Sequence, residues 1–352
     1  MLVAGAPVPR LHVKTLPCRS VDSHPELAPD LRTLSEVSED ELLADLFPML
    51  RASAVQVLGP GDDAAVLATG ARTVATTDAM VLGPDWRDDW STATDLGVKA
   101  VTQNLADVAA MGARPTALLA TLVAGGDTHV AWVRELTASL AAEASAHEVS
   151  LVGGDLSSAG PGVRMVSLTA LGDLDGRDPV RRDGARPGDV LAVAGTLGRS
   201  HAGLLLLQGG VGEGGRVPPS TQAAEAIAHH RAPRAPIEQG AIAADAGANS
   251  MIDLSDGLAR DAHRLARASG VRLDILRDAM ELDALHAAAA VGWDRAWECV
   301  LSGGEEHSLL ATFPSQREVP TGWRIIGVVT DGEGVALDDE PLAPRGWDHF
   351  GG

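Results

Sequence analysis

Apolar residues recur at helical spacing in several stretches of the chain, and the clearest of these predicts a helix over residues 94–111. Its apolar stripe consists of Val98, Val101, Leu105 and Val108. Asn104 and Asp107 lie three residues apart on the same helix, so the spacing places both side chains on one flank beside the stripe. A shorter helix is predicted after Ser38, which forms a capping-box pattern with Glu41.

Runs of aliphatic and β-branched residues predict strands between the helices, and these strands divide the chain into two units. In the first unit the runs lie at residues 59–67, 72–82, 116–124, 149–155 and 163–172. Pro187 and Gly188 precede a further strand and mark the boundary of the second unit. We therefore expect a leader at residues 1–35, an N-terminal domain at 36–178 and a C-terminal domain at 179–352.

The composition is that of a globular protein whose core contains few aromatic residues. Of the 352 residues, 45% are hydrophobic and 22% are charged, whereas 3% are aromatic and tyrosine is absent. This length suits two domains of similar size. The core must be built from Ala, Val and Leu, and aromatic platforms on which nucleic-acid bases stack are not expected.

The charge balance limits the class of partner. Lys and Arg total 28 against 48 Asp and Glu, and the resulting net charge of -20 argues against a nucleic-acid partner. Lys14 and Lys99 are the only lysines, and the phosphate-binding pattern G-x-x-x-x-G-K-[ST] is absent. If the chain binds a nucleotide, metal ions, arginines and backbone amides must meet most of the phosphate charge.

Targeting and redox signals are weak. No run of apolar residues approaches the roughly 20 that a bilayer span needs. Residues 1–20 are interrupted by proline and basic residues and lack the continuous apolar segment of a secretory signal. Cys18 and Cys299 lie far apart and support neither a disulfide framework nor a zinc site. We expect a cytoplasmic protein that has no membrane partner.

Carboxylates recur beside glycines and small polar residues. In the stretch LVGGDLSS, Asp155 could close a turn, cap a helix or hold a metal while the glycines admit a large charged ligand. The theme recurs along the chain, and its members are Asp62, Asp63, Asp78, Asp107, Asp155, Asp253 and Asp256. None lies in an EF-hand pattern, whereas Mg²⁺ uses few carboxylates per ion together with phosphate oxygens and water. The recurrence therefore indicates a cleft that holds several Mg²⁺ ions.

A set of motifs resembles the thiamine-monophosphate kinases, a family of the aminoimidazole-ribonucleotide-synthetase-like ATP-binding superfamily. In chain order they are GDDAAVL, TTDAMVLGPDW, KAVTQNLADVAAMGARP, LVGGDLSS, RRDGARPGD, IDLSDGLARD, LSGGEEHSLL and GWDHF, and they span about residues 36–350. The resemblance implies an α+β fold of two α/β-type domains: an N-terminal sheet domain that pairs in a homodimer, a C-terminal mixed-sheet domain, and an ATP cleft between them. It also implies ATP-dependent phosphorylation of thiamine monophosphate to thiamine diphosphate.

The resemblance further implies roles for individual residues. The magnesium ligands would be Asp63, Thr76, Thr77, Asp78, Asp107, Asp155, Asp253 and Asp256, and the nucleotide contacts would be Gly154, Arg182 and Ser255. Glu305 and Trp347 would hold the thiamine moiety. Asp85 stands where the family commonly has a histidine, so we expect it to turn toward a metal or the cationic thiazolium ring or, as we favour, into solvent. The family's GGEDYEL is here GGEEHSL, which changes residues beside Glu305.

The implied reaction needs no general base from the protein. A phosphate monoester has a second pKa near ~6 and is largely ionised at neutral pH, so direct in-line transfer between Mg²⁺-bound phosphates is expected. Two alternatives stay open. One is an amide- or selenide-activating synthetase, although the leader offers only Cys18 and Lys14 as reactive groups. The other is a non-catalytic paralogue marked by GGEEHSL.

Two further features are interpreted as structural. G-x-G-x-x-G occurs at residues 210–215, but Arg-Val-Pro-Pro follows it instead of a helix, which does not favour a dinucleotide site. His229 and His230 are expected on the solvated face of a surface helix, not in a metal pair.

Overall fold

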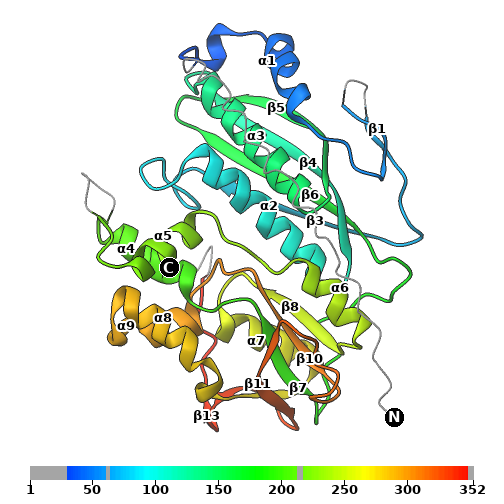
Figure 1. The fold of residues 1–352 in the computed structure, drawn as a ribbon, viewed down its shortest axis with the longest axis vertical. Coiled ribbons are helices and arrows are strands. Elements are labelled where there is room, and N and C mark those ends of the chain that lie inside the picture. The colour runs from blue at the N-terminus through cyan, green and yellow to red at the C-terminus, as the bar shows by residue number, and fades with distance from the viewer. Residues whose placement is uncertain (1–29, 61–63, 212–216, 348–352) are drawn as a thin grey trace, which may run out of the picture.

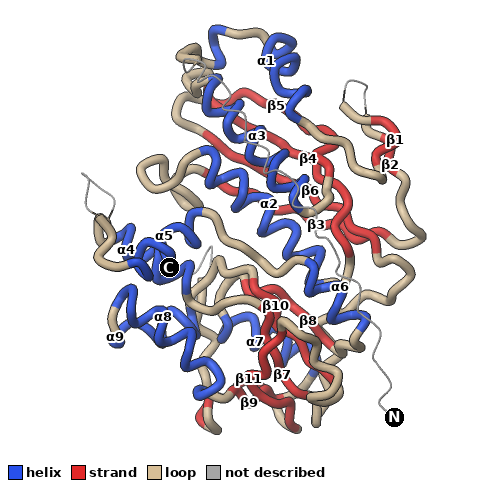
Figure 2. The backbone as a smooth tube through the Cα atoms, in the orientation of Figure 1, coloured by secondary structure: helices blue, strands red, loops and turns tan. Residues whose placement is uncertain are grey.

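The computed structural model describes residues 30–60, 64–211 and 217–347. Its strands form two main groups, separated in space by helices (Figures 1 and 2). A small two-stranded sheet of β1 (Gln56–Leu58) and β2 (Val66–Leu67) lies beside the first group. No helix of the described residues is both long and apolar enough to cross a membrane. Asp62 and Asp63, the latter a predicted magnesium ligand, lie outside the described residues.

The N-terminal group is a four-stranded sheet with the order β3-β6-β4-β5. Its strands are β3 (Thr73–Val81), β4 (Arg114–Gly125), β5 (Ser150–Ala159) and β6 (Arg164–Asp173). β4 and β5 are parallel, and the other neighbours are antiparallel. Helices α2 (Ala93–Ala110) and α3 (Val130–Ala146) pack on one face of this sheet, while no described helix covers the other face (Figure 1).

The C-terminal group is a seven-stranded mixed sheet with the order β13-β12-β9-β11-β7-β10-β8. Its strands are β7 (Val190–Ala194), β8 (Ser250–Leu254), β9 (Arg272–Ile275), β10 (Ser308–Phe313), β11 (Trp323–Thr330), β12 (Gly334–Leu337) and β13 (Glu340–Pro341). β7, β8 and β10 are buried along their whole length, because both faces of the sheet are covered there.

The remaining helices are mostly short. They are α1 (Glu39–Leu46), α4 (Arg199–Gln208), α5 (Thr221–Arg231), α6 (Glu238–Asp245), α7 (Leu258–Ser269), α8 (Glu281–Val291) and α9 (Trp293–Ser302), with 3₁₀ turns at Leu34–Glu36, Phe47–Met49 and Arg277–Met280. α7, α8 and α9 contribute apolar side chains to a core on one face of the seven-stranded sheet. The fold is therefore layered as sheet, helices, sheet, helices.

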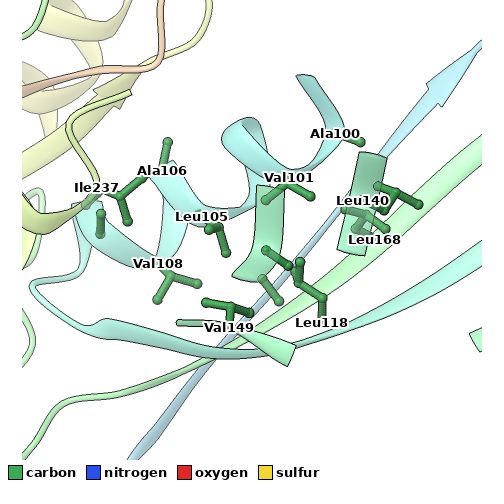
Figure 3. Close-up of a cluster of buried hydrophobic side chains, with 14 of the residues drawn as sticks. Ala100, Val101, Leu105, Ala106, Val108, Leu118, Leu140, Val149, Leu168 and Ile237 are labelled. Atoms are coloured by element: carbon green, nitrogen blue, oxygen red, sulfur yellow. The ribbon is translucent and has the colours of Figure 1, made fainter. Parts of the chain in front are cut away.

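Helix α2 is buried between the two sheets. Side chains from both sheets join those of α2 in one apolar cluster, and α2 contacts β8 and α6 as well as β3 and β6. Figure 3 shows the part of this cluster around α2 and the four-stranded sheet. Burial extends to polar residues such as Asn104 and Lys99, far beyond the predicted stripe. Gly97 allows α3 to approach α2, since a Cβ there would lie 2.4 Å from the Cβ of Ser139. The helix predicted at 94–111 is confirmed as an element, but it is covered on more sides than an amphipathic surface helix.

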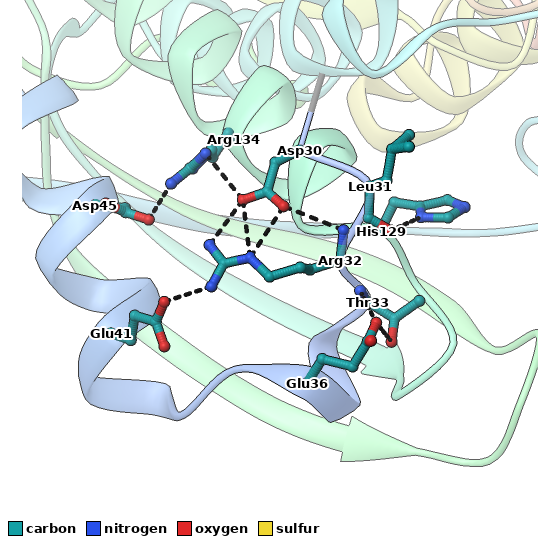
Figure 4. Close-up of polar contacts among 9 residues, drawn as sticks. All are labelled: Asp30, Leu31, Arg32, Thr33, Glu36, Glu41, Asp45, His129 and Arg134. Carbon is teal, nitrogen blue, oxygen red and sulfur yellow. Dashed lines mark hydrogen bonds and ion pairs between the residues drawn. The ribbon is translucent and has the colours of Figure 1, made fainter. Parts of the chain in front are cut away.

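The start of the described chain is held by ion pairs (Figure 4). Arg32 contacts Asp30 at 2.8 Å and Glu41 at 2.5 Å, while Arg134 of α3 pairs with Asp30 and Asp45. The predicted cap of α1 is half confirmed: the Ser38 hydroxyl accepts from the amide of Glu41 at 3.2 Å. The Glu41 carboxylate accepts a hydrogen bond from Arg32, because the arginine offers a stronger, charged partner than the helix start.

Candidate active site

A pocket of about 570 Å³ lies between the two domains. The N-terminal domain lines it with the end of β3, the following loop and one face of α2, and the C-terminal domain lines it with the turn after β8, the loop before β10 and parts of α4 and α9. Predicted site residues that reach it are Asp78, Asp85, Asp107, Arg182, Asp253, Ser255, Asp256, Glu305 and Trp347. The fold thus brings residues more than 250 positions apart to one cleft.

Carboxylates of both domains meet in this pocket. Asp78 belongs to β3 and Asp107 to α2, and the two elements are joined by side-chain hydrogen bonds. The Thr76 hydroxyl donates to Asp107 Oδ2 at 2.9 Å, and the amide of Asp78 donates to Asn104 Oδ1 at 3.1 Å. The predicted flank of Asn104 and Asp107 therefore faces β3. Asp253 closes the group from the end of β8.

The carboxylates repel one another in the absence of a cation. Burial, followed by the charge of Asp253, raises the pKa of Asp107 to about 6. His307 Nδ1 lies 3.7 Å from Asp253 Oδ2. Burial disfavours the charged form of this imidazole, but the neighbouring carboxylate outweighs burial and raises the pKa of His307 above its ordinary value. The site is therefore an environment that attracts cations.

The donor set fits a hard divalent cation. Its members are aspartate oxygens with hydroxyls nearby, and Mg²⁺ prefers oxygen ligands. Among the described residues no three acidic, histidine or cysteine side chains are close enough to form a complete metal cage. Mg²⁺ keeps several water or phosphate ligands, so a partial set of carboxylates suits an ion that arrives with a nucleotide.

The turn after β8 is braced by its own helix. Asp261 of α7 accepts from the amides of Asp256 and Gly257 at 3.0 and 3.2 Å, and Arg264 contacts Asp256 at 2.5 Å. Burial and the charge of Asp253 raise the pKa of Asp261 to about 7. The amide of Trp347 donates to the carbonyl of Asp256 at 3.0 Å, so the same turn holds the chain near its C-terminal end.

The loop GGEEH turns its side chains alternately toward and away from the pocket. Glu305 and His307 line the pocket and have left-handed backbones, with φ of 61° and 53°. Such values are uncommon for residues with side chains and often occur at functional sites. The Glu305 amide donates to the carbonyl of Ser255 at 2.7 Å and the His307 amide to that of Leu254 at 3.0 Å. These bonds hold the loop against the end of β8.

Glu306, between them, points away from the pocket and anchors α4. Its carboxylate accepts from the Ser200 amide at 2.6 Å, in the first turn of α4, and from the Thr196 hydroxyl at 2.8 Å. His229 Nε2 lies 3.2 Å from the same carboxylate. The change from GGEDYEL to GGEEHSL replaces the family's aspartate by Glu306, so a carboxylate is kept at this helix start.

The expectation that His229 and His230 lie on a solvated face is wrong. Both are largely buried, because α5 packs against the GGEEH loop and its histidines face the carboxylates of Glu306 and Glu305. His230 Nδ1 lies 3.2 Å from Glu305 Oε2. The sequence shows the helix but not the acidic loop, some 75 residues later, that covers it.

Asp85 is partly buried at the pocket wall and makes a local contact. Its Oδ2 accepts from the amide of Val81 at 2.7 Å and closes the turn after β3. The same turn is closed by the Asp85 amide, which donates to the Val81 carbonyl at 3.1 Å. Trp86 and Trp90, which follow in the same loop, add aromatic surface to the pocket.

Some predicted residues lie away from this pocket lining. Thr76 reaches it only through Asp107, whereas Thr77, the next residue of the strand, points to the opposite face of the sheet. Thr77 pairs with Thr169, and the strand register puts Asp155 on that same open face of edge strand β5. Asp155 lies within the strand, so neither a turn nor a helix cap explains it.

The glycine before Asp155 has a structural explanation. A Cβ on Gly154 would lie 1.9 Å from the carbonyl oxygen of Ala120 in β4, so a side chain would part the two strands. This close approach of backbone to backbone accounts for the glycine without a ligand.

Two residues of α2, one beside the pocket and one lining it, were missed by the sequence reasoning. Lys99, 3% exposed, places its Nζ 2.6 Å from Glu305 Oε1. Gln103, one turn further along α2, lines the pocket between Lys99 and Asp107 in sequence. The available signal was their spacing. Lys99 precedes Gln103 by four residues and Asp107 by eight, and residues at such spacings share one helix face.

Known proteins match the chain over both domains. The N-terminal and C-terminal domains of AIR synthase related proteins match residues 61–174 and 186–340. Thiamine-monophosphate kinase of Mycobacterium tuberculosis is 45% identical over 331 residues, which cover 92% of this chain and 95% of that relative.

Solved structures give the same result. One described as "AaThiL complexed with AMPPCP and TMP" is 31% identical with a TM-score of 0.71, covering 79% of this chain and 87% of that chain. Thiamine-monophosphate kinase of Stenotrophomonas maltophilia is 29% identical with a TM-score of 0.73, covering 86% and 96%. From its sequence identity, coverage and fold, the chain belongs to the thiamine-monophosphate kinase family.

Proposed function

We propose that this protein transfers the γ-phosphoryl group of ATP to thiamine monophosphate and releases thiamine diphosphate and ADP. The observation that carries the proposal is the pocket between the domains, where aspartates of both domains gather and Glu305 and three tryptophans, Trp86, Trp90 and Trp347, also line the wall. Aspartates suit metal-bound phosphates, and a carboxylate with aromatic surface suits a cationic ring. The relative in complex with AMPPCP and TMP supports both substrates.

The residues divide by the part of the substrates that they would meet. We assign Mg²⁺ to Asp78, Asp107, Asp253 and Asp256, with Asp63, Thr76, Thr77 and Asp155 as the further ligands that the family resemblance implies. Arg182, Ser255 and Gly154 are assigned to the nucleotide, and Glu305 and Trp347 to thiamine monophosphate. Asp85 receives no substrate role, because its carboxylate closes its own turn. Bound Mg²⁺ would neutralise the phosphates and reduce their mutual repulsion.

The reaction is a direct displacement. A terminal oxygen of thiamine monophosphate forms a bond to the γ-phosphorus, the bond from that phosphorus to the β,γ-bridging oxygen breaks, and ADP leaves with the electron pair. The chain's own part is to orient and to exclude water: Asp107 is fixed by Thr76, and the turn carrying Ser255 and Asp256 is fixed by Asp261. No side chain needs to remove a proton, because the acceptor phosphate is already ionised at neutral pH.

We also propose a homodimer formed through the uncovered face of the four-stranded sheet. Leu119 is 39% exposed and Val81 38% exposed on that face, where Thr77 and Asp155 also lie. A sheet face that carries exposed aliphatic residues favours a covering partner. In such a dimer, Thr77 and Asp155, which do not line the pocket of one chain, would lie at the interface with the second chain.

The experiment is to incubate the purified protein with ATP, Mg²⁺ and thiamine monophosphate and to follow thiamine diphosphate and ADP by chromatography. Equimolar appearance of both products supports the proposal. ATP cleavage without thiamine diphosphate would point to an amide- or selenide-activating relative, and binding of both ligands without turnover would point to a non-catalytic paralogue.

A further inference from the structure

One buried cluster is not explained by metal or nucleotide binding. Both oxygens of the Glu305 carboxylate have a basic partner: Lys99 Nζ at 2.6 Å from Oε1 and His230 Nδ1 at 3.2 Å from Oε2. The partners come from α2 of the N-terminal domain and α5 of the C-terminal domain. The Glu305 side chain keeps 35% of its surface exposed, and it lines the pocket.

The two partners determine the charge and the orientation of this carboxylate. Burial by itself would raise the pKa of Glu305, but the positive charge of Lys99 and the contact with His230 outweigh burial and hold it well below the usual range. The carboxylate therefore stays ionised. Two contacts on different oxygens also fix its plane, which a single contact would leave free to rotate.

We propose that Lys99 and His230 are positioning residues that hold Glu305 as a fixed anion for the positively charged ring of the phosphate acceptor. The inference rests on the proposed function, because it takes thiamine monophosphate, with its cationic thiazolium, as that acceptor. Lys99 is not among the residues that line the pocket, whereas Glu305 is, so Lys99 acts through Glu305. Without it the carboxylate loses its strongest partner and the driving force for ionisation, so attraction for a cationic ring falls.

The chain offers a matched control for each partner. Arg324 and Asp283 form an ion pair at 2.6 Å, the same distance as Lys99 and Glu305, but line no part of the pocket. His229 and Glu306 lie 3.2 Å apart, as His230 and Glu305 do, and Glu306 points away from the pocket. Lys99→Met is compared with Arg324→Met, and His230→Gln with His229→Gln. These comparisons separate the general effect of losing a polar pair from the specific effect of losing a partner of Glu305.

The measurements are the KM values for thiamine monophosphate and MgATP, the Kd for thiamine monophosphate by calorimetry, and the melting temperature. We expect Lys99→Met to raise KM and Kd for thiamine monophosphate at least tenfold and His230→Gln at least threefold, with the KM for MgATP within twofold of wild type. Both controls should change the KM for thiamine monophosphate less than twofold, whatever they do to the melting temperature.

A double-mutant cycle gives the decisive readout. In a Glu305→Gln background, Lys99→Met should add less than twofold to the KM, because its effect passes through the missing carboxylate. If Lys99→Met does not fold, the same cycle is made with His230→Gln. Wild-type affinity in both single variants, additive effects in the cycle, or equal effects in the controls would each overturn the inference. A wild type that does not phosphorylate thiamine monophosphate overturns the proposed function, whereas wild-type turnover with unaffected variants overturns only the inference.

Discussion

At the scale of single residues, neighbouring carboxylates of the site repel one another in the folded protein. Asp107 and Asp253 come from different domains and are drawn into one buried region, where the pKa of Asp107 rises to about 6 through burial and the neighbouring charge. Folding places these groups where they are unfavourable when no cation is present. This cost to stability is expected where a site is built to bind a ligand of opposite charge.

Replacing Asp107 by Asn should therefore lower activity and raise stability. The Asp107 carboxyl group holds its proton to a higher pH in the folded protein than in the unfolded chain. Its contribution to the free energy of unfolding therefore falls as pH rises from about 4 to about 6. The penalty above pH 6 is on the order of 2–3 kcal/mol. In EDTA at pH 7.5, urea unfolding of Asp107→Asn should need more denaturant than wild type, and the gain should shrink at pH 4.5. The same variant should lose at least ~100-fold in kcat. Equal stability at both pH values would contradict this account.

Asp85 leads to a different expectation, because its carboxylate is engaged by the amide of Val81. Asp85→Ala should leave the KM for thiamine monophosphate within about threefold of wild type, since the side chain contacts its own turn. The variant should lose about 1 kcal/mol of stability with the hydrogen bond, and Asp85→Asn, which keeps an acceptor oxygen, should lose less. A tenfold rise in this KM alone, with the KM for ATP unchanged, would instead place Asp85 at the substrate.

At the scale of elements, the close approach of α6 to α2 ties the domains together. Gly240 of α6 lies against α2 so tightly that a Cβ would come 2.1 Å from the carbonyl oxygen of Ala109. The crossing belongs to the same apolar cluster that joins both sheets, with Ile237 beside it (Figure 3). A residue without a side chain is required here by packing and not by backbone conformation.

Gly240→Ala should consequently destabilise the protein although alanine favours helices. The gain in helix propensity is about 1 kcal/mol, whereas forcing α6 away from α2 is expected to cost more, leaving a net loss of ~1–3 kcal/mol. Gly160→Ala serves as the control, because no atom lies within 4 Å of the added Cβ. Its effect should stay within ~0.5 kcal/mol. Urea unfolding midpoints of the two variants test the difference, and equal midpoints would refute it.

Elements were easier to predict than the faces they present. Hydrophobic period and stop signals gave α2 to within a residue at each end, and the strand at 72–82 became β3 (Thr73–Val81). The alternation within β3 also contained the information that Thr76 and Thr77 point to opposite faces. The contacts of Lys99 and His230 with Glu305 could not be predicted in this way, because they join segments that only the tertiary fold brings together.

At the scale of the whole molecule, net charge and exposed apolar surface have opposite effects on association between copies of the chain. A net charge of -20 favours solubility and mutual repulsion between copies, yet the four-stranded sheet presents aliphatic residues on its uncovered face. In the proposed dimer, short-range burial would exceed screened repulsion at ordinary salt, because charges more than about 8–10 Å apart are largely screened. Association should thus strengthen as salt is added.

Light scattering should give a mass of about 73 kDa, twice 36.3 kDa, at moderate salt. Leu119→Asp, which puts a charge on the uncovered face, should give a monomer with an unchanged circular dichroism spectrum. Leu282→Asp is the matched control, since Leu282 of α8 is 64% exposed on another part of the surface. A monomeric wild type, or a dimer that survives Leu119→Asp, would rule out this interface.

With the roles proposed above, the spacing of Lys99, Gln103 and Asp107 along α2 sets the distance between the contact for the substrate's ring and the contact for its phosphate. Lys99 contacts the carboxylate assigned to the ring, and Asp107 belongs to the aspartates assigned to the phosphates. Eight residues separate them, a rise of about 12 Å along a helix. Because α2 is clamped between two sheets, this distance does not adapt as a loop would. A molecule with a different distance between its charged ring and its phosphate can contact Glu305 or the aspartates, but not both. Selection among substrates by their length then comes from the rigid core of the fold.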